Sequence, residues 1–326
     1  MRPKDANSNM IVPQIRDMSL DVVTIRLEDT EVVVYKAWLT GVSPYFKKAF
    51  DGSSKEAEEQ AITLVDVSER IFRMFLGWTH AHSLQFPTTS AALHHEVLLT
   101  PGEIESLGIM PRENKETATV GNWFAVFDEE DFHPRSQDEG AYHDSTAWLH
   151  NCTLFSLTIA QLYVFADKYS VPQLRDDILT AFVGQCWRWN WWSNQQTDSK
   201  IFIHNNIPAS SKFVKFLAYS IAWTGPQSVE KGIAHKLRAL QQLSPDLAIE
   251  VGIALAEKVD LGALNEESTI SVCTADNIPN ACPFHDHEVL DQEQCRERIA
   301  KRPHVFTAIL QACAHDVMRE TGSDRG

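Results

Sequence analysis

The stretch from Asp21 to Phe50 constrains the fold of this chain more than any other part of the sequence. Between residues 23 and 27, apolar side chains alternate with polar ones, which is the period-two pattern of a half-buried strand. Residues 28–30 are polar and turn-prone, and residues 31–34 resume a β-branched run. This pattern predicts a β-hairpin.

After the hairpin, the pattern changes from a period of two to helical spacing. The helical spacing begins at Lys36, Gly41 interrupts it, and Ser43 with Pro44 restarts it. A serine oxygen can cap the free amides at a helix start, and proline suits the first helical position. The second helix is predicted to carry one apolar stripe, made of Tyr45, Phe46, Ala49 and Phe50.

This order of elements, with these residues, resembles the opening of the BTB/POZ fold. The family begins with an Asp-Val strand, a hairpin, a Lys-Ala-x-Leu helix start and a Ser-Pro-x-Phe helix. The corresponding residues here are Asp21-Val22, Lys36-Ala37-Trp38-Leu39 and Ser43-Pro44-Tyr45-Phe46. Tyr35 stands where the family usually has a histidine, so this chain lacks the imidazole that could carry a charge there.

Two later segments extend the resemblance. Asp66-Val67-Ser68 precedes an aromatic-rich helix that reaches Leu84, as in the family. The segment from Ala166 to Arg175 joins two helical patterns and resembles the closing BTB helices, most like those of the large fungal BTB-domain family. Between these segments, residues 85–150 lack sustained periodicity and contain recurrent proline and glycine, which is typical of an insertion.

We therefore predict an α+β fold. A BTB/POZ domain, with a short β-sheet flanked by helices and interrupted by a long insertion, is followed by an all-α C-terminal domain. The predicted parts are a flexible leader at 1–18, the BTB/POZ domain at 19–84 plus 151–184, a partly disordered insertion at 85–150, a helical domain at 185–265, and a Cys/His-containing tail with a final helix at 266–326.

Charge and hydropathy narrow the classes of function. The formal net charge of -15 disfavours attraction to phosphate backbones or anionic lipid, so we expect no direct nucleic-acid contact and no membrane binding. No apolar run approaches the roughly 20 residues that span a bilayer, and the first ten residues lack a signal-peptide core. We expect an intracellular protein, in cytoplasm or nucleus, whose six cysteines are free thiols or metal ligands.

The sequence predicts an interaction protein and not an enzyme. It contains no GxGxxG, GxxxxGK[ST], GxSxG or HExxH motif. The BTB resemblance implies a homodimer in which the first strand and first helix of one chain are buried against the other. The residues that the resemblance places in this dimer interface are Val22, Val23, Ile25, Trp38, Leu39 and Val42.

Two stretches are candidates for contact with a different protein. Many BTB proteins are substrate adaptors of cullin ubiquitin ligases and use a hydrophobic-x-Glu triplet, whose nearest match is Ala57-Glu58-Glu59, although alanine offers little surface. The alternative within this class is a transcription-associated assembly factor without its own DNA-binding motif. In the insertion, Trp123 and Phe127 either anchor a partner or pack back on their own domain as part of a strand.

One cluster near the end of the sequence has metal-ligand chemistry. It offers the thiolate and imidazole donors that zinc prefers, at a spacing that matches no common zinc finger. Its residues are Cys282, His285, His287 and Cys295, with Cys273 and His304 as spare candidates. Three interpretations remain open: a structural zinc site, a polar loop with incidental cysteine and histidine, and a metal-dependent enzyme. No other cofactor is expected.

Overall fold

The computed structural model describes residues 21–28, 30–83, 146–188, 202–203, 205–224, 237–238, 240–242, 244–264, 281–301, 305–306, 309–310 and 312–313. The predicted leader, the pair Trp123 and Phe127, and the spare candidates Cys273 and His304 lie outside these residues. The chain forms two compact units. Unit 1 comprises Met1–Leu98 with Phe165–Val171, and unit 2 comprises Leu99–Val164 with Pro172–Gly326.

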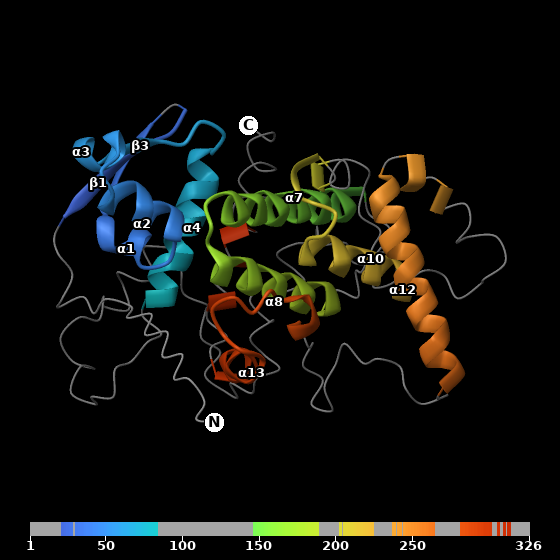
Figure 1. Ribbon diagram of the computed structural model, residues 1–326. Coiled ribbons are helices and arrows are strands. Elements are labelled where there is room, and N and C mark those ends of the chain that lie inside the picture. Colours follow the sequence, from blue (N-terminus) through green and yellow to red (C-terminus); the bar gives the residue numbers. More distant parts are fainter. Residues whose placement is uncertain are drawn as a thin grey trace, which may run out of the picture. The chain divides into compact units, whose positions relative to one another are not determined.

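Unit 1 is built from a small sheet and short helices in the order that the sequence predicts (Figure 1). The strand order is β2-β1-β3, in which β1 pairs antiparallel with β2 and parallel with β3. This arrangement confirms the predicted hairpin and the α+β class. The elements are β1 (Val22–Arg26), β2 (Glu31–Tyr35), α1 (Lys36–Thr40), α2 (Pro44–Asp51), α3 (Lys55–Glu59), β3 (Ala61–Thr63) and α4 (Glu69–Ser83).

An aromatic cluster forms the core of unit 1. The Phe46 ring is fully buried and stacks with those of Phe50, Phe75 and Tyr169, at centroid distances of 6.3, 6.1 and 5.7 Å. The ring of Phe165 lies 4.9 Å from that of Phe75. Phe165 and Tyr169 come from a distant part of the sequence, so the core of unit 1 is completed only when that segment packs against α2 and α4.

Ser43 ties the start of α2 to the same distant segment. Its Oγ accepts a hydrogen bond from the Phe46 amide at 3.1 Å, which confirms the predicted helix cap. The same hydroxyl donates a hydrogen bond to the carbonyl of Tyr169 at 2.6 Å, and Ser43 is buried. One side chain therefore satisfies a helix terminus and a buried carbonyl together.

Replacing Ser43 by alanine is expected to lower the free energy of unfolding of unit 1 by about 2 kcal/mol, because a cap is lost and a buried carbonyl loses its donor. Urea denaturation of the full chain measures this loss. Ser68→Ala is the matched control, since Ser68 is exposed and caps α4 through a longer contact of 3.4 Å to the Ile71 amide. Equal losses for the two variants would contradict the double role of Ser43.

Unit 2 is helical among its described residues. Its described elements are α7, α8, α10, α12, the 3-10 turn η5 and α13. Their bounds are Thr146–Lys168 for α7, Pro172–Arg188 for α8, Lys212–Thr224 for α10, Pro245–Leu264 for α12, Cys282–Phe284 for η5 and Gln292–Lys301 for α13. Ser211 caps the start of α10 and Ser244 the start of α12, because each serine Oγ accepts an amide hydrogen bond at 3.2 Å. None of the described helices is long and apolar enough to cross a membrane.

Helix α7 departs from the predicted layout in two ways. It begins at Thr146, inside the stretch 85–150 that the sequence analysis assigns to the insertion. Its residues also divide between the units, because contacts group only Phe165–Val171 with unit 1. The rest of the predicted closing hairpin, 151–164 and 172–184, groups with unit 2. Helical periodicity locates a helix but carries no information about which neighbours it packs against.

Candidate functional site

The outer face of the β1–β2 hairpin is exposed and largely apolar. Val22 lies opposite Tyr35 and Thr24 opposite Val33, so these four side chains share one face, which we call the hairpin face. The exposed fractions of Val22, Val33 and Tyr35 are 48%, 63% and 39%. The ring of Trp38 lies edge-on to that of Tyr35 at 5.5 Å. Among the three described strands, β2 is an edge strand.

Half of the residues that the BTB resemblance places in a dimer interface are buried inside unit 1. Val23, Ile25 and Leu39 are at most 1% exposed because they face the core. They have no surface to offer a second chain, which corrects this part of the expectation. The other three residues keep some exposure; they are Val22, on the hairpin face, and the partly exposed Trp38 and Val42.

The triplet proposed for cullin contact lies on α3. Ala57 is half-buried, whereas Glu58 and Glu59 are exposed. Glu59 lies within ion-pair distance of Lys55, at 3.5 Å, and of Arg26, at 3.8 Å. The triplet therefore presents carboxylates and one methyl group, without a large apolar side chain.

The structure brings the four predicted metal ligands together in unit 2. The possible donor atoms of Cys282, His285, His287 and Cys295 all lie within 4.8 Å of one another. The two Sγ atoms are 3.5 Å apart and are not joined in a disulfide, and His285 Nδ1 lies 3.0 Å from Cys295 Sγ. Three of the residues are buried, and His287 is partly exposed. The group can hold one metal ion.

Local structure explains how the donors converge. Cys282 begins the short turn η5, which closes through a hydrogen bond from the His285 amide to the Cys282 carbonyl at 3.1 Å. Cys295 lies in the first turn of α13, whose start is fixed by a reciprocal capping box. In that box Asp291 Oδ1 accepts from the Gln294 amide at 2.9 Å, and Gln294 Oε1 accepts from the Asp291 amide at 3.1 Å.

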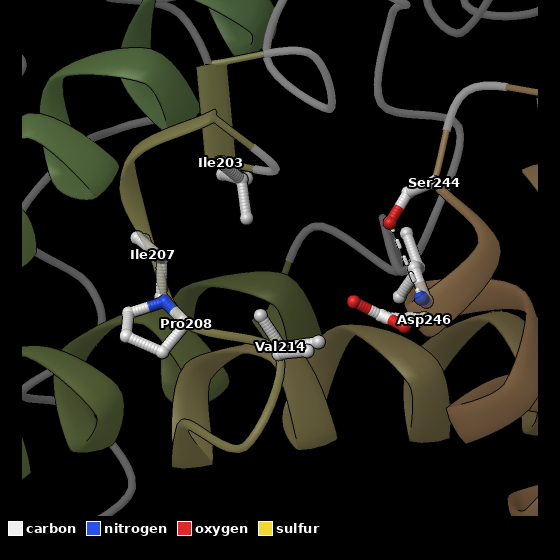
Figure 2. Close-up of a pocket in the computed structure, with 8 residues that line it drawn as sticks. Ile203, Ile207, Pro208, Val214, Ser244 and Asp246 are labelled. Carbon is white, nitrogen blue, oxygen red and sulfur yellow. Dashed lines mark hydrogen bonds between the residues drawn. The ribbon is translucent and has the colours of Figure 1, made fainter.

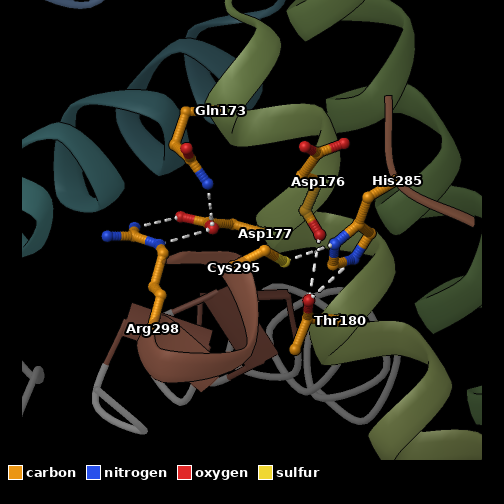
Figure 3. A network of polar contacts seen from close by, with 7 residues as sticks. All are labelled: Gln173, Asp176, Asp177, Thr180, His285, Cys295 and Arg298. Carbon is orange, nitrogen blue, oxygen red and sulfur yellow. Dashed lines mark hydrogen bonds and ion pairs between the residues drawn. The ribbon is translucent and has the colours of Figure 1, made fainter. Parts of the chain in front are cut away.

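Helix α8 holds the loop that carries the two histidines (Figure 3). The carboxylate of Asp176, which is buried, accepts hydrogen bonds from the backbone amides of Asp286 at 2.9 Å and His287 at 3.3 Å. One turn further along α8, Thr180 Oγ1 lies 3.0 Å from His285 Nε2. These contacts fix both the backbone and one ring of the loop. His287 itself adopts a positive φ of 54°. This backbone conformation costs energy, so it persists only where surrounding contacts hold it in place.

The contact with Thr180 determines which nitrogen of His285 is available. Thr180 Oγ1 donates its proton to the Asp176 carbonyl at 3.1 Å, so toward His285 it acts as an acceptor. In the tautomer with the hydrogen on Nε2, His285 donates to Thr180 Oγ1, and Nδ1, which faces the Cys295 sulfur, keeps its lone pair. This is the outer-shell hydrogen bond that normally orients a metal-binding histidine.

A buried ion pair joins α8 to α13 beside the cluster. Arg298 donates to Asp177 through Nε at 3.1 Å and through Nη2 at 2.6 Å, and Gln173 Nε2 donates to the same carboxylate at 2.9 Å (Figure 3). Asp177 is 1% exposed and Arg298 6%. Arg175, which also lies on α8, contacts the loop that carries the two histidines. It forms ion pairs with Asp286 at 3.3 Å and with Glu288.

The supporting residues on α8 were missed by the sequence analysis. Asp176, Asp177 and Thr180 lie in a helix whose other side chains are mostly apolar and buried. Adjacent acids in such a helix are themselves a signal, because carboxylates are rarely buried without partners. Their partners in the segment 281–301 lie more than 100 residues away in the sequence, and no spacing rule connects them.

Electrostatics in the cluster follows from the contact between the two thiols. A hydrogen bond from Cys295 lowers the pKa of Cys282, and the same contact raises the pKa of Cys295. The pKa of Asp176 is raised, chiefly because burial disfavours its charge.

A small pocket lies elsewhere in unit 2 (Figure 2). It has a volume of about 140 Å³, whereas small-molecule sites are roughly 300–1,000 Å³. Its wall is mostly apolar, with Ser244 and Asp246 as polar members at the start of α12. Ser244 Oγ is already engaged as the acceptor for the Leu247 amide, at 3.2 Å. The pocket is too small for a substrate of ordinary size.

The sheet of unit 1, with its exposed hairpin face, has the character of an interaction module. Residues 16–100 match the family model of the BTB/POZ domain, a span of less than a third of the 326 residues. The chain therefore contains a BTB/POZ domain, which is a protein–protein interaction module of a kind that is generally not enzymatic. Among curated proteins, none matches the chain. The likeness to the fungal group stays a prediction.

Proposed function

We propose that the BTB domain joins two copies of this chain through the hairpin face and that the dimer recruits a further protein. The observation that carries this proposal is the exposure of Val22, Val33 and Tyr35 on one face of a strand pair. Apolar side chains grouped on a surface mark contact sites. An edge strand such as β2 also presents unpaired backbone groups to another chain.

The charges around the hairpin face favour a second copy as the occupant. The full chain carries a net charge of -15, which opposes association of like molecules in general. On the hairpin, however, Arg26 and Glu31 pair at 3.1 Å and neutralise each other. A two-fold interface uses the same patch on both chains, so a neutral apolar patch can meet its own copy without repulsion.

Val33→Glu is expected to raise the dimer dissociation constant by roughly tenfold or more, because it places two like charges at the centre of the proposed contact. Sedimentation equilibrium of the full chain over a range of concentrations measures this constant. Val65→Glu is the matched control, since Val65 is a valine of comparable exposure in the loop after β3, outside the hairpin face. Equal dissociation constants for the two variants would remove the hairpin face from the interface.

Recruitment of a cullin scaffold through α3 is a second candidate, supported by the exposed carboxylates of Glu58 and Glu59. Ala57 offers only a methyl group to a groove, so we place self-association first. A pull-down with purified cullin tests the candidate, with Ala57→Met as the variant that supplies a larger apolar side chain. If both the natural chain and this variant fail to bind, the adaptor role is removed and the dimer proposal stands.

A further inference from the structure

We propose that Cys282, His285, His287 and Cys295 bind one Zn²⁺ ion and that this ion fastens the segment from η5 to α13 onto α8. The site lies wholly in unit 2, and none of its ligands belongs to the matched BTB/POZ region. It therefore adds a function to the chain that is independent of dimer formation.

The donor geometry is close to that of a tetrahedral zinc site. With Zn–S bonds of about 2.3 Å and Zn–N bonds of about 2.0 Å, the edges of the tetrahedron are roughly 3.3–3.8 Å. Here the two sulfurs are 3.5 Å apart, His285 Nδ1 lies 3.0 Å from Cys295 Sγ, and no pair of donor atoms exceeds 4.8 Å. Shifts of a few tenths of an ångström to one ångström place all four donors around one ion.

Each histidine offers a defined nitrogen. His285 presents Nδ1, because this nitrogen lies 3.0 Å from Cys295 Sγ while Nε2 lies 3.0 Å from Thr180 Oγ1. His287 presents Nε2, which is buried and has no hydrogen-bond partner among the described residues. A buried nitrogen without a partner is costly, and coordination of an ion removes that cost.

The donor set selects the metal. Two thiolates and two imidazoles in a tetrahedral arrangement suit Zn²⁺, whereas Ca²⁺ and Mg²⁺ take oxygen ligands. Two thiolates also neutralise the charge of a dication, which suits a site where Cys282 and Cys295 are 2% and 4% exposed. The acids around the site do not point to a hard cation, because Asp176 is occupied by backbone amides and Asp286 by Arg175.

The ion is structural and not catalytic. Four protein donors complete its coordination, whereas catalytic zinc keeps one position for water or substrate. This disfavours the metal-dependent enzyme that the sequence left open.

The ion acts together with the contacts of α8. Thr180 orients the His285 ring, and Asp176 holds the amide of His287. Phe284, the last residue of η5, packs edge-on against Phe216 and Tyr219 of α10 at centroid distances of 5.3 and 5.4 Å. The segment 281–301 thus combines one apolar anchor, one buried ion pair and the metal. Removing the metal leaves two adjacent thiols and an unpaired imidazole nitrogen in a buried place, so the segment should loosen first.

Elemental analysis of the purified full chain, prepared without added metal, is expected to give one zinc per chain. Replacement by Co²⁺ should produce the sulfur-to-metal charge-transfer absorption and the intense visible bands of a tetrahedral site with two thiolates. Chelation should increase hydrogen exchange in residues 281–301, and Zn²⁺ but not Mg²⁺ should restore protection. These readouts use the natural chain and do not depend on the folding of any variant.

Variants identify the ligands. Cys295→Ser and His287→Ala are expected to abolish stoichiometric zinc, whereas Cys273→Ser and His304→Asn, the matched controls, should retain it. Thr180→Val keeps the side-chain volume but removes the acceptor of His285, and it is expected to weaken zinc binding by about 10–100-fold in competition with a chelator. That change in affinity distinguishes a positioning role from simple packing.

Three results would overturn the proposal. The first is a chain that, with Cys282 and Cys295 reduced, contains no zinc and binds none when Zn²⁺ is added. The second is full zinc content in both Cys295→Ser and His287→Ala. The third is loss of zinc in a control variant while those two retain it. None of these results would affect the dimer proposal, whose measurement is the dissociation constant.

Discussion

Replacing Phe46 by alanine is expected to lower the free energy of unfolding of unit 1 by about 3–5 kcal/mol. The Phe46 ring is 0% exposed and stacks with Phe50, Phe75 and Tyr169. Alanine leaves a cavity where four rings meet, and one of these rings comes from the distant segment Phe165–Val171. Removal of the Phe46 ring should therefore destabilise both segments of unit 1 together, Met1–Leu98 and Phe165–Val171.

Hydrogen exchange resolved by peptide measures this effect in the full chain. Faster exchange is expected in α2, in α4 and in residues 165–171, because these parts share the cluster. Lys47→Ala is the matched control on the same helix, where an exposed side chain should change stability by no more than about 0.5 kcal/mol. If exchange rose in α2 alone, Phe165–Val171 would not be part of the core of unit 1.

Asp177→Ala is expected to destabilise unit 2 by about 3–5 kcal/mol, because it leaves the guanidinium of Arg298 buried without its carboxylate. The pair is bidentate, at 3.1 and 2.6 Å, and Gln173 also donates to Asp177. The carboxylate therefore satisfies three donor groups from two elements. Chemical denaturation of the full chain gives the loss, and exchange in α8 and α13 locates it.

The double variant Asp177→Leu with Arg298→Met separates charge from packing. Replacing both members by apolar side chains of similar size removes the uncompensated charge, so it should cost clearly less than Asp177→Ala alone. Arg296→Ala, at an exposed position of the same helix, is the control and should be nearly neutral. A double variant as unstable as the single one would show that the charge pair is not the source of the stability.

Local rules predict unit 1 well. The hairpin and the helix start at Ser43 both follow from residues that are neighbours in the sequence. Caps, turns and periodic faces are local in origin, so a single sequence contains them. The clustering of two cysteines and two histidines was also predictable, since the four residues lie within one short segment.

The dimer interface that the resemblance implies includes buried residues, because a family resemblance alone does not say which side chains of a strand are exposed. Val22 and Val23 are adjacent in a strand, so they point to opposite faces and cannot both meet a second chain. The alternating pattern predicts a strand with one buried face, and Val23 and Ile25 lie on that buried face. The sequence does not place Val33 and Tyr35 on this exposed face, because their positions opposite Thr24 and Val22 depend on the register of the hairpin.

The surroundings of the cluster could not be predicted, because they arise from contacts between distant elements. Asp176 and Thr180 lie more than 100 residues before the loop that they hold. A buried acid in an apolar helix indicates that it has a partner. Only the packing of α8 against the segment 281–301 identifies that partner. The division of α7 between two units has the same origin, since it depends on which neighbours each turn contacts.

Native mass spectrometry of the purified full chain measures self-association through the BTB domain. At micromolar concentration we expect a species of twice the chain mass, which Val33→Glu shifts to single chains and Val65→Glu leaves unchanged. A natural chain found only at single-chain mass under these conditions would contradict the dimer proposal.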